Sequence, residues 1–250
     1  MVRHLPCRYG GYCELRNSDE NMCETALKWE DLRQLARLRQ RTRLAGYRCL
    51  KDFHDGAFEC DYVSPFTKSG NNVNAEIMIV GQDWAGADYL ANDPQAFDDA
   101  ARGYDPNSLT NRKLDSLLED HFGVSREECC LTNLFPFIKP GGMSARIRLG
   151  DLICCARMFT LPEIRIVCPR LVICLGLETF RAVGSAACPG RVRRIRLKEG
   201  IDSPFCLDGI SVHCVAHPAV RPGNRSSAQI KEDWSNLANL LASKLGPASD

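Results

Sequence analysis

Four apolar runs of strand length, separated by segments with helical spacing, constrain the fold of this chain more than any other feature. The first run, residues 75–81, is apolar on both faces, which is typical of a parallel strand that is buried between two layers of helices. Alternation of such strands with helices indicates an α/β fold. We therefore expect a three-layer α/β/α fold around a mostly parallel four-stranded sheet. The expected strands are residues 75–81, 129–135, 171–176 and 210–218.

Helical spacing and turn residues predict the elements between the strands. We expect a turn-rich hairpin within 190–209 and, in the long helix at 144–166, an interruption at Pro162. The chain then divides into a cysteine-containing extension with a basic helix, residues 1–70, and an α/β domain, residues 71–250. The expected helices are residues 25–45, 110–122, 144–166, 177–184 and 226–245.

Charge and hydropathy exclude several classes of protein. The net charge is +1, so the chain is not a histone-like basic binder, and no apolar run reaches the length of a membrane helix. The N-terminus has no apolar signal region, so we expect a cytoplasmic protein. Residues 25–51 are strongly basic and residues 85–128 strongly acidic. These segments are either solvated faces or contact surfaces for nucleic acid or another domain.

The chain has 14 cysteines, and without a secretion signal they do not indicate a disulfide framework. Cys7, Cys13 and Cys23 lie in a polar N-terminal stretch, where a zinc or iron–sulfur site is an open alternative. The sequence contains no pair of cysteines with two residues between them, which disfavours that alternative. We expect that no cofactor is required.

Polar side chains lie at or near the ends of three of the expected strands. Asp83 comes after the first strand, Asn133 lies in the second and His217 lies at the end of the last. Taken singly, each residue type is common in turns and helix caps. Ligands of open α/β sheets bind at the carboxyl ends of the strands, however, and there these three side chains would surround one cleft.

Four segments around these residues resemble the uracil-DNA glycosylase superfamily. AEIMIVGQDWAG is similar to its first motif, LTNLFPF to the strand with the base-reading Asn, PRLVICLGLETFRAV to its Leu-Gly strand and helix, and VAHPAVRPGN to its final His-Pro motif. The four segments occur in the order of the superfamily and cover roughly residues 75–245.

The resemblance implies a role for each matching residue. Asp83 would orient the attacking water and stabilise positive charge on the sugar, and Gln82 would present its backbone N–H to the base. Asn133 would read the uracil edge, because an amide can donate and accept at once. His217 would donate a hydrogen bond to the departing base. Trp84 would line the base pocket.

Three further residues are candidates for contacts with DNA. By resemblance, Arg221 would fill the gap left by the extruded nucleotide or contact phosphate. Lys139 belongs to a Gly-rich loop that would seat a phosphate, and Ser226 begins the C-terminal helix, whose free N–H groups would bind another. The alternatives for the last two are an ordinary loop and a simple helix cap.

The chain departs from the superfamily pattern at several positions. Ala85 stands where one branch has a Tyr that blocks the thymine methyl group, so the pocket is wider or another aromatic residue fills it. Ala219 replaces a Ser of the final motif. The aromatic residue that stacks on the base is not identified, and the candidates are Phe66, Phe97 and Phe135.

The resemblance implies a monofunctional DNA glycosylase that removes uracil, or a related damaged pyrimidine, from single- or double-stranded DNA without a metal. Two alternatives stay open. The first is a nucleic-acid-binding member of the fold that does not cleave. The second is a glycosylase for a bulkier modified base. We expect a monomer that binds DNA and no membrane.

Overall fold

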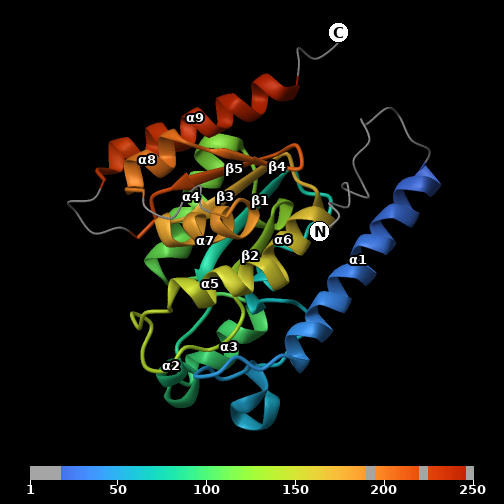
Figure 1. Ribbon diagram of the computed structural model, residues 1–250, viewed down its shortest axis with the longest axis vertical. Coiled ribbons are helices and arrows are strands. Elements are labelled where there is room, and N and C mark those ends of the chain that lie inside the picture. The colour runs from blue at the N-terminus through green and yellow to red at the C-terminus, as the bar shows by residue number, and fades with distance from the viewer. Residues whose placement is uncertain (1–17, 190–194, 220–224, 246–250) are drawn as a thin grey trace.

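The sheet at the centre of the computed structural model has five strands in the order β2-β1-β3-β5-β4 (Figure 1). β1, β2, β3 and β5 are parallel, as the four apolar runs predict, and β4 pairs antiparallel with β5 at one edge. The structure describes residues 18–189, 195–219 and 225–245. The strands are β1 (Ile77–Asp83), β2 (Cys130–Phe135), β3 (Leu171–Leu175), β4 (Phe205–Leu207) and β5 (Ile210–Val215).

The fifth strand is the difference from the expected four-stranded sheet. β4 has only three residues, and its middle residue, Cys206, is exposed, so β4 lacks a continuous apolar run. Asp208 and Gly209 have positive φ angles of 51° and 91° and turn the chain back into β5. Within the expected hairpin segment 190–209, the described residues thus form this turn, β4 and helix α8 (Leu197–Asp202).

Side chains of β1 alternate between two apolar cores. Met78 and Val80 pack in a cluster with residues of α5 (Leu149–Cys155), α6 (Leu161–Val167) and α7 (Leu177–Ala187). Ile77 and Ile79 pack with residues of α4 (Leu109–Phe122) and α9 (Ser227–Leu245). All four are almost fully buried. Because β1 is paired on both edges and covered on both faces, a polar residue has no solvated position between Ile77 and Gly81, and polar residues appear only at its carboxyl end.

The helices expected at 110–122, 177–184 and 226–245 are present as α4, α7 and α9, with ends that differ by at most three residues. They enclose the sheet in three layers, which confirms the α/β/α arrangement. Besides α1 (Ser18–Arg41) and α8, the described α-helices are α2 (Ala87–Asn92), α3 (Gln95–Arg102), α4 (Leu109–Phe122), α5 (Leu149–Cys155), α6 (Leu161–Val167), α7 (Leu177–Ala187) and α9 (Ser227–Leu245).

The long helix expected at 144–166 begins later and is divided. α5 starts at Leu149, and a π-helical turn, Ala156–Thr160, joins it to α6. Pro162 lacks the N–H group that would bond to the carbonyl of Met158, and the wide π turn lies directly before it. The interruption therefore precedes Pro162.

Helix α1 (Ser18–Arg41) lies along one side of the α/β body (Figure 1) and ends four residues before the expected end. Its last turn is fixed by Arg39, whose side chain is fully buried. The guanidinium forms an ion pair with Glu59 and donates to the carbonyls of Cys60 and Tyr62 at 2.6 and 2.8 Å. A buried cation needs such partners, so this contact holds the helix against the segment that follows it.

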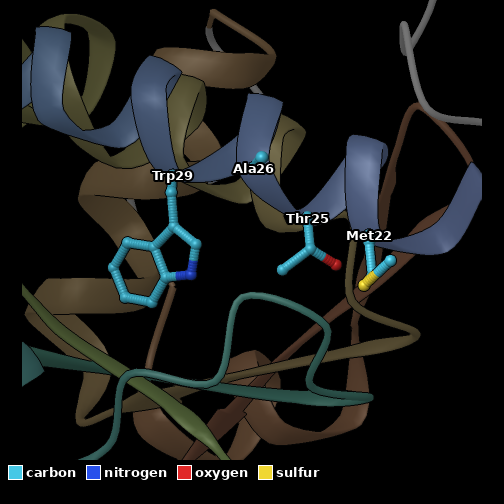
Figure 2. Close-up of a pocket in the computed structure, with 4 residues that line it drawn as sticks. All are labelled: Met22, Thr25, Ala26 and Trp29. Carbon is cyan, nitrogen blue, oxygen red and sulfur yellow. The ribbon is translucent and has the colours of Figure 1, made fainter. Parts of the chain in front are cut away.

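The first half of α1 carries a shallow hollow of about 370 Å³ (Figure 2). Its side chains lie on the side of the helix that faces a loop, and Asn74 Nδ2 donates to the Thr25 hydroxyl across this gap at 2.8 Å. The residues that line the hollow are Met22, Thr25, Ala26 and Trp29.

Among the described helices, none combines the length and the apolar character needed to cross a membrane.

Candidate active site

A cleft of about 1030 Å³ opens at the carboxyl ends of the parallel strands. Strands that run in the same direction end at the same edge of the sheet, so residues far apart in the chain meet there. This cleft brings together six of the eight site residues expected from the sequence. They are Gln82, Asp83, Trp84, Asn133, Lys139 and His217.

Asp83, the last residue of β1, is the carboxylate of the cleft. Its side chain is 10% exposed, and its Oδ2 lies 2.6 Å from Lys139 Nζ. Burial raises the pKa of the Asp83 carboxyl above its ordinary value, because the charged form loses water. The ammonium of Lys139 opposes that rise. The Asp83 carboxylate thus lies in a site with little water and has the Lys139 ammonium as its charged partner.

Lys139 has a different contact from the one that the sequence indicates. We expected it to seat a DNA phosphate, but its side chain is 4% exposed and its ammonium faces Asp83. It also donates to the carbonyl oxygen of Met143 at 2.6 Å. Both contacts lie inside the cleft, so in this structure Lys139 is the partner of the carboxylate and not a surface cation.

Two loops interlock to hold this ion pair. Gly86 forms a parallel bridge with Lys139, and the N–H of Ala87 donates to the Lys139 carbonyl at 2.9 Å. The N–H of Asp88 donates to the Gly141 carbonyl at 3.2 Å. A Cβ atom on Gly86 would lie 2.6 Å from that same carbonyl oxygen. Only glycine permits this approach, so the loop after β1 positions the lysine beside its carboxylate.

Asn133 lies in β2 beside Gly81 of β1, its register partner. Its side chain is buried, and its Oδ1 accepts a hydrogen bond from the Ser64 hydroxyl at 2.8 Å. A Cβ atom on Gly81 would lie 2.5 Å from Asn133 Nδ2. The amide therefore occupies space that any side chain at position 81 would take.

His217 lies two residues after β5, at an exposed position on the edge of the cleft. Surrounding protein atoms still reduce its contact with water enough to lower the pKa of its imidazole. The N–H of Ala219 donates to His217 Nδ1 at 3.3 Å. Nδ1 is then an acceptor, and the proton of the neutral ring is on Nε2, which is free to donate into the cleft.

Phe66 is the only one of the three candidate stacking residues that lines the described cleft. Phe135 is fully buried in the core, and Phe97 packs outside the cleft against other aromatic rings. Tyr104 also lines the cleft, with the Arg126 guanidinium 3.8 Å from its ring centre. The sequence did not indicate Tyr104, because its partner is far away in the chain.

Ala85 is not part of the cleft wall near Asp83, which is lined instead by aromatic residues. Ala85 is buried in an apolar cluster and does not line the cleft. Trp84 and Tyr89 both line it, and Trp84 Nε1 donates to the Gly103 carbonyl at 2.9 Å. Gln82, on the same strand end, is half-buried at the cleft wall. The aromatic wall thus comes from residues on either side of Ala85.

Residues 67–238 match the family described as the Uracil DNA glycosylase superfamily. The chain belongs to this superfamily. No individual curated protein matches the chain. Membership supports a glycosylase-type function, that of a hydrolase that acts on DNA. Ser64 and Phe66 precede the matched region, although both contribute to the site.

Of the remaining two predicted residues, Ser226 does not line the described cleft. Arg221 lies outside the described residues. Ser226 is exposed and caps α9: its hydroxyl accepts from the Gln229 N–H at 3.2 Å, and its own N–H donates to Gln229 Oε1 at 2.9 Å. This reciprocal arrangement is a capping box, the simpler of the two roles expected for Ser226.

Arg146 is a cation of the cleft that sequence reasoning missed. It lies in the loop between β2 and α5, lines the cleft and is exposed. The structure gives it no ion pair among the described residues, whereas Lys139 of the same loop is paired internally. The Gly-rich loop thus presents an exposed cation to the cleft, at a position seven residues beyond the expected one.

The thiols considered for a metal are not assembled in the described part of the chain. There, no group of three His, Cys, Asp or Glu side chains is arranged to hold a metal ion. Cys23 is exposed on α1, and Cys7 and Cys13 lie outside the described residues.

Proposed function

We propose that the protein hydrolyses the N-glycosidic bond of uracil, or of a related damaged pyrimidine, in DNA and leaves an abasic site. In this proposal it is a monofunctional glycosylase. The observation that carries the proposal is the convergence of Asp83, Asn133 and His217 in one cleft. The carboxylate can stabilise the cationic sugar, the amide can bind the edge of the base, and the neutral imidazole can donate a hydrogen bond to the departing base.

Asp83 acts on the sugar. As the bond between C1′ and the base nitrogen breaks, its electron pair leaves with the base and the sugar becomes cationic. A carboxylate that is only 10% exposed stabilises this cation strongly, because little water screens the attraction. Water then adds to C1′, and Asp83 orients it and takes up its proton.

Asn133 and His217 act on the base. Asn133 presents an amide to the uracil edge. His217 donates from Nε2 to the base oxygen that gains negative charge, and its lowered pKa keeps the ring neutral, so that no proton need be transferred. A base must leave the helical stack to reach these groups, at a cost of a few kcal/mol, and the ring of Phe66 offers it a new stacking partner.

The test is excision from end-labelled oligonucleotides that carry one uracil, either single-stranded or paired with G or A. Alkali converts each abasic site into a strand break. Breaks at the uracil position support the proposal. Tight binding without breaks would contradict it and favour the non-catalytic member of the fold. Breaks only with larger substituents on the pyrimidine would favour the bulkier substrate.

Replacing Gly81 by alanine is expected to slow uracil excision by about 10²-fold, the effect of displacing a base-reading group by roughly 1 Å. The new Cβ would meet the amide of Asn133, whose Nδ2 lies 2.5 Å from its position. Single-turnover kinetics measure the change. Gly150→Ala is the matched control, since nothing lies within 4 Å of a Cβ there. Equal rates in both variants would contradict the placement of Asn133.

Replacing Arg146 by alanine is expected to weaken DNA binding on all sequences alike and to reduce the slope of log affinity against log salt by about one. Titrations at several salt concentrations measure both quantities. Arg170→Ala is the control, because Arg170 directly precedes the amino end of β3, whereas the cleft lies at the carboxyl ends of the strands. An unchanged salt slope for Arg146→Ala would show that this side chain does not contact phosphate.

A further inference from the structure

Ser64 is a fully buried residue whose hydroxyl has two contacts. Its Oγ accepts the N–H of Phe66 at 3.2 Å, as the cap of the short 3-10 helix Pro65–Ser69. It also lies 2.8 Å from Asn133 Oδ1. Since the backbone contact uses a lone pair of the oxygen, the hydroxyl hydrogen is free to donate to Oδ1. Ser64 thus makes Oδ1 an acceptor that is already engaged.

This contact determines which way round the amide of Asn133 lies. With Oδ1 on Ser64, Nδ2 is beside Gly81, and no described residue accepts a hydrogen bond from it. The residue lines the cleft, so this N–H group is the one available there. A flipped amide would direct N–H toward Ser64 and leave the buried hydroxyl hydrogen without its acceptor, which is costly in a dry site.

We propose that Ser64 is a positioning residue that sets the base specificity of the site through Asn133. The inference rests on the proposed function. Held by Ser64, Asn133 donates to the carbonyl at position 4 of uracil, whereas cytosine has an amino group there and would oppose donor to donor. Ser64 lies before residues 67–238, so the recognition of the base depends on a segment outside the matched region.

The experiment compares the single-turnover rates of uracil and cytosine excision, with long incubations for cytosine. Ser64→Ala removes the hydroxyl, Ser64→Cys keeps the size but donates weakly, and Ser64→Thr retains a hydroxyl. Ser69→Ala is the matched control: Ser69 is a buried serine of the same 3-10 helix, and its hydroxyl donates to the Phe66 carbonyl. Thermal unfolding shows which variants are folded.

We expect the uracil-to-cytosine ratio to fall by about 10-fold or more in Ser64→Ala and Ser64→Cys, the usual worth of one base contact. Ser64→Thr and Ser69→Ala should keep the wild-type ratio. Uracil excision by the wild type with an unchanged ratio in the folded Ala or Cys variant would overturn the role of Ser64 alone. A wild-type protein that excises no uracil would instead refute the proposed function beneath it.

Discussion

Replacing Asp83 by asparagine is expected to slow single-turnover uracil excision by about 10²–10⁴-fold, the range for loss of a catalytic acid–base group or a preorganised charge. Asparagine has nearly the same shape but cannot carry the charge that stabilises the cationic sugar. DNA affinity should stay the same or rise, because an anion that faces the anionic DNA is removed from the cleft. End-labelled oligonucleotides measure the rate, and fluorescence anisotropy measures the affinity.

Asp88→Asn is the control for the same chemical change. Asp88 is an exposed residue of α2, near Asp83 in the chain but outside the cleft lining. Its variant should excise at the wild-type rate, which separates the role of one carboxylate from a general loss of negative charge. Undiminished excision by a folded Asp83→Asn protein would remove Asp83 from the mechanism.

The position of Asp83 and its neighbours follows from features that a sequence displays locally. A strand that is buried on both faces shows as a continuous apolar run, and polar residues at its end are then at the carboxyl edge of a parallel sheet. This reasoning is enough to predict from the sequence that one cleft contains Asp83, Asn133 and His217. The sequence predicted a hairpin within 190–209, but β4 could not be predicted as a strand of the central sheet because it is short and its middle residue, Cys206, is exposed.

The partners of these residues depend on contacts between distant loops, and the sequence has no local signal for them. Lys139 reaches Asp83 because Gly86 and Lys139 form a bridge between two loops. The residue types alone equally suited a phosphate contact, but the exposed cation of this loop that lines the cleft is Arg146. Ser64 reaches Asn133 across 69 positions in the chain, from the segment that the sequence indicated to be an extension.

Replacing Lys139 by methionine is expected to move the acidic limb of the activity profile to higher pH. Burial favours the neutral form of Asp83, and Lys139 is the charge that opposes it. Loss of an adjacent cation raises the pKa of a carboxyl. Since excision needs the carboxylate, the rate of Lys139→Met should begin to fall at a higher pH than that of the wild type and recover as the pH rises. Single-turnover rates across the pH range measure the profile.

Lys198→Met is the control for the pH profile. Lys198 is an exposed residue of α8 and does not line the cleft. It loses the same charge from the chain without touching Asp83, so its profile should coincide with that of the wild type. A Lys139→Met profile lowered by one factor at every pH would contradict the proposed effect on Asp83, because a structural defect alone does not depend on the ionisation of that carboxyl.

The ion pair between Asp83 and Lys139 also affects how the folding stability depends on pH. A carboxyl whose pKa is higher in the folded than in the unfolded state stabilises the fold at low pH, and this stabilisation is lost as the pH rises through the folded-state pKa. Removing Lys139 raises the folded-state pKa of Asp83 further. The melting temperature of Lys139→Met should therefore fall further below that of the wild type at pH 8 than at pH 5. In Lys139→Met, the excision rate should rise and the melting temperature should fall over the same pH interval, because both report the ionisation of the Asp83 carboxyl. Misfolding would lower the rate and the stability together, so opposite pH dependences in one variant distinguish the ionisation of Asp83 from misfolding.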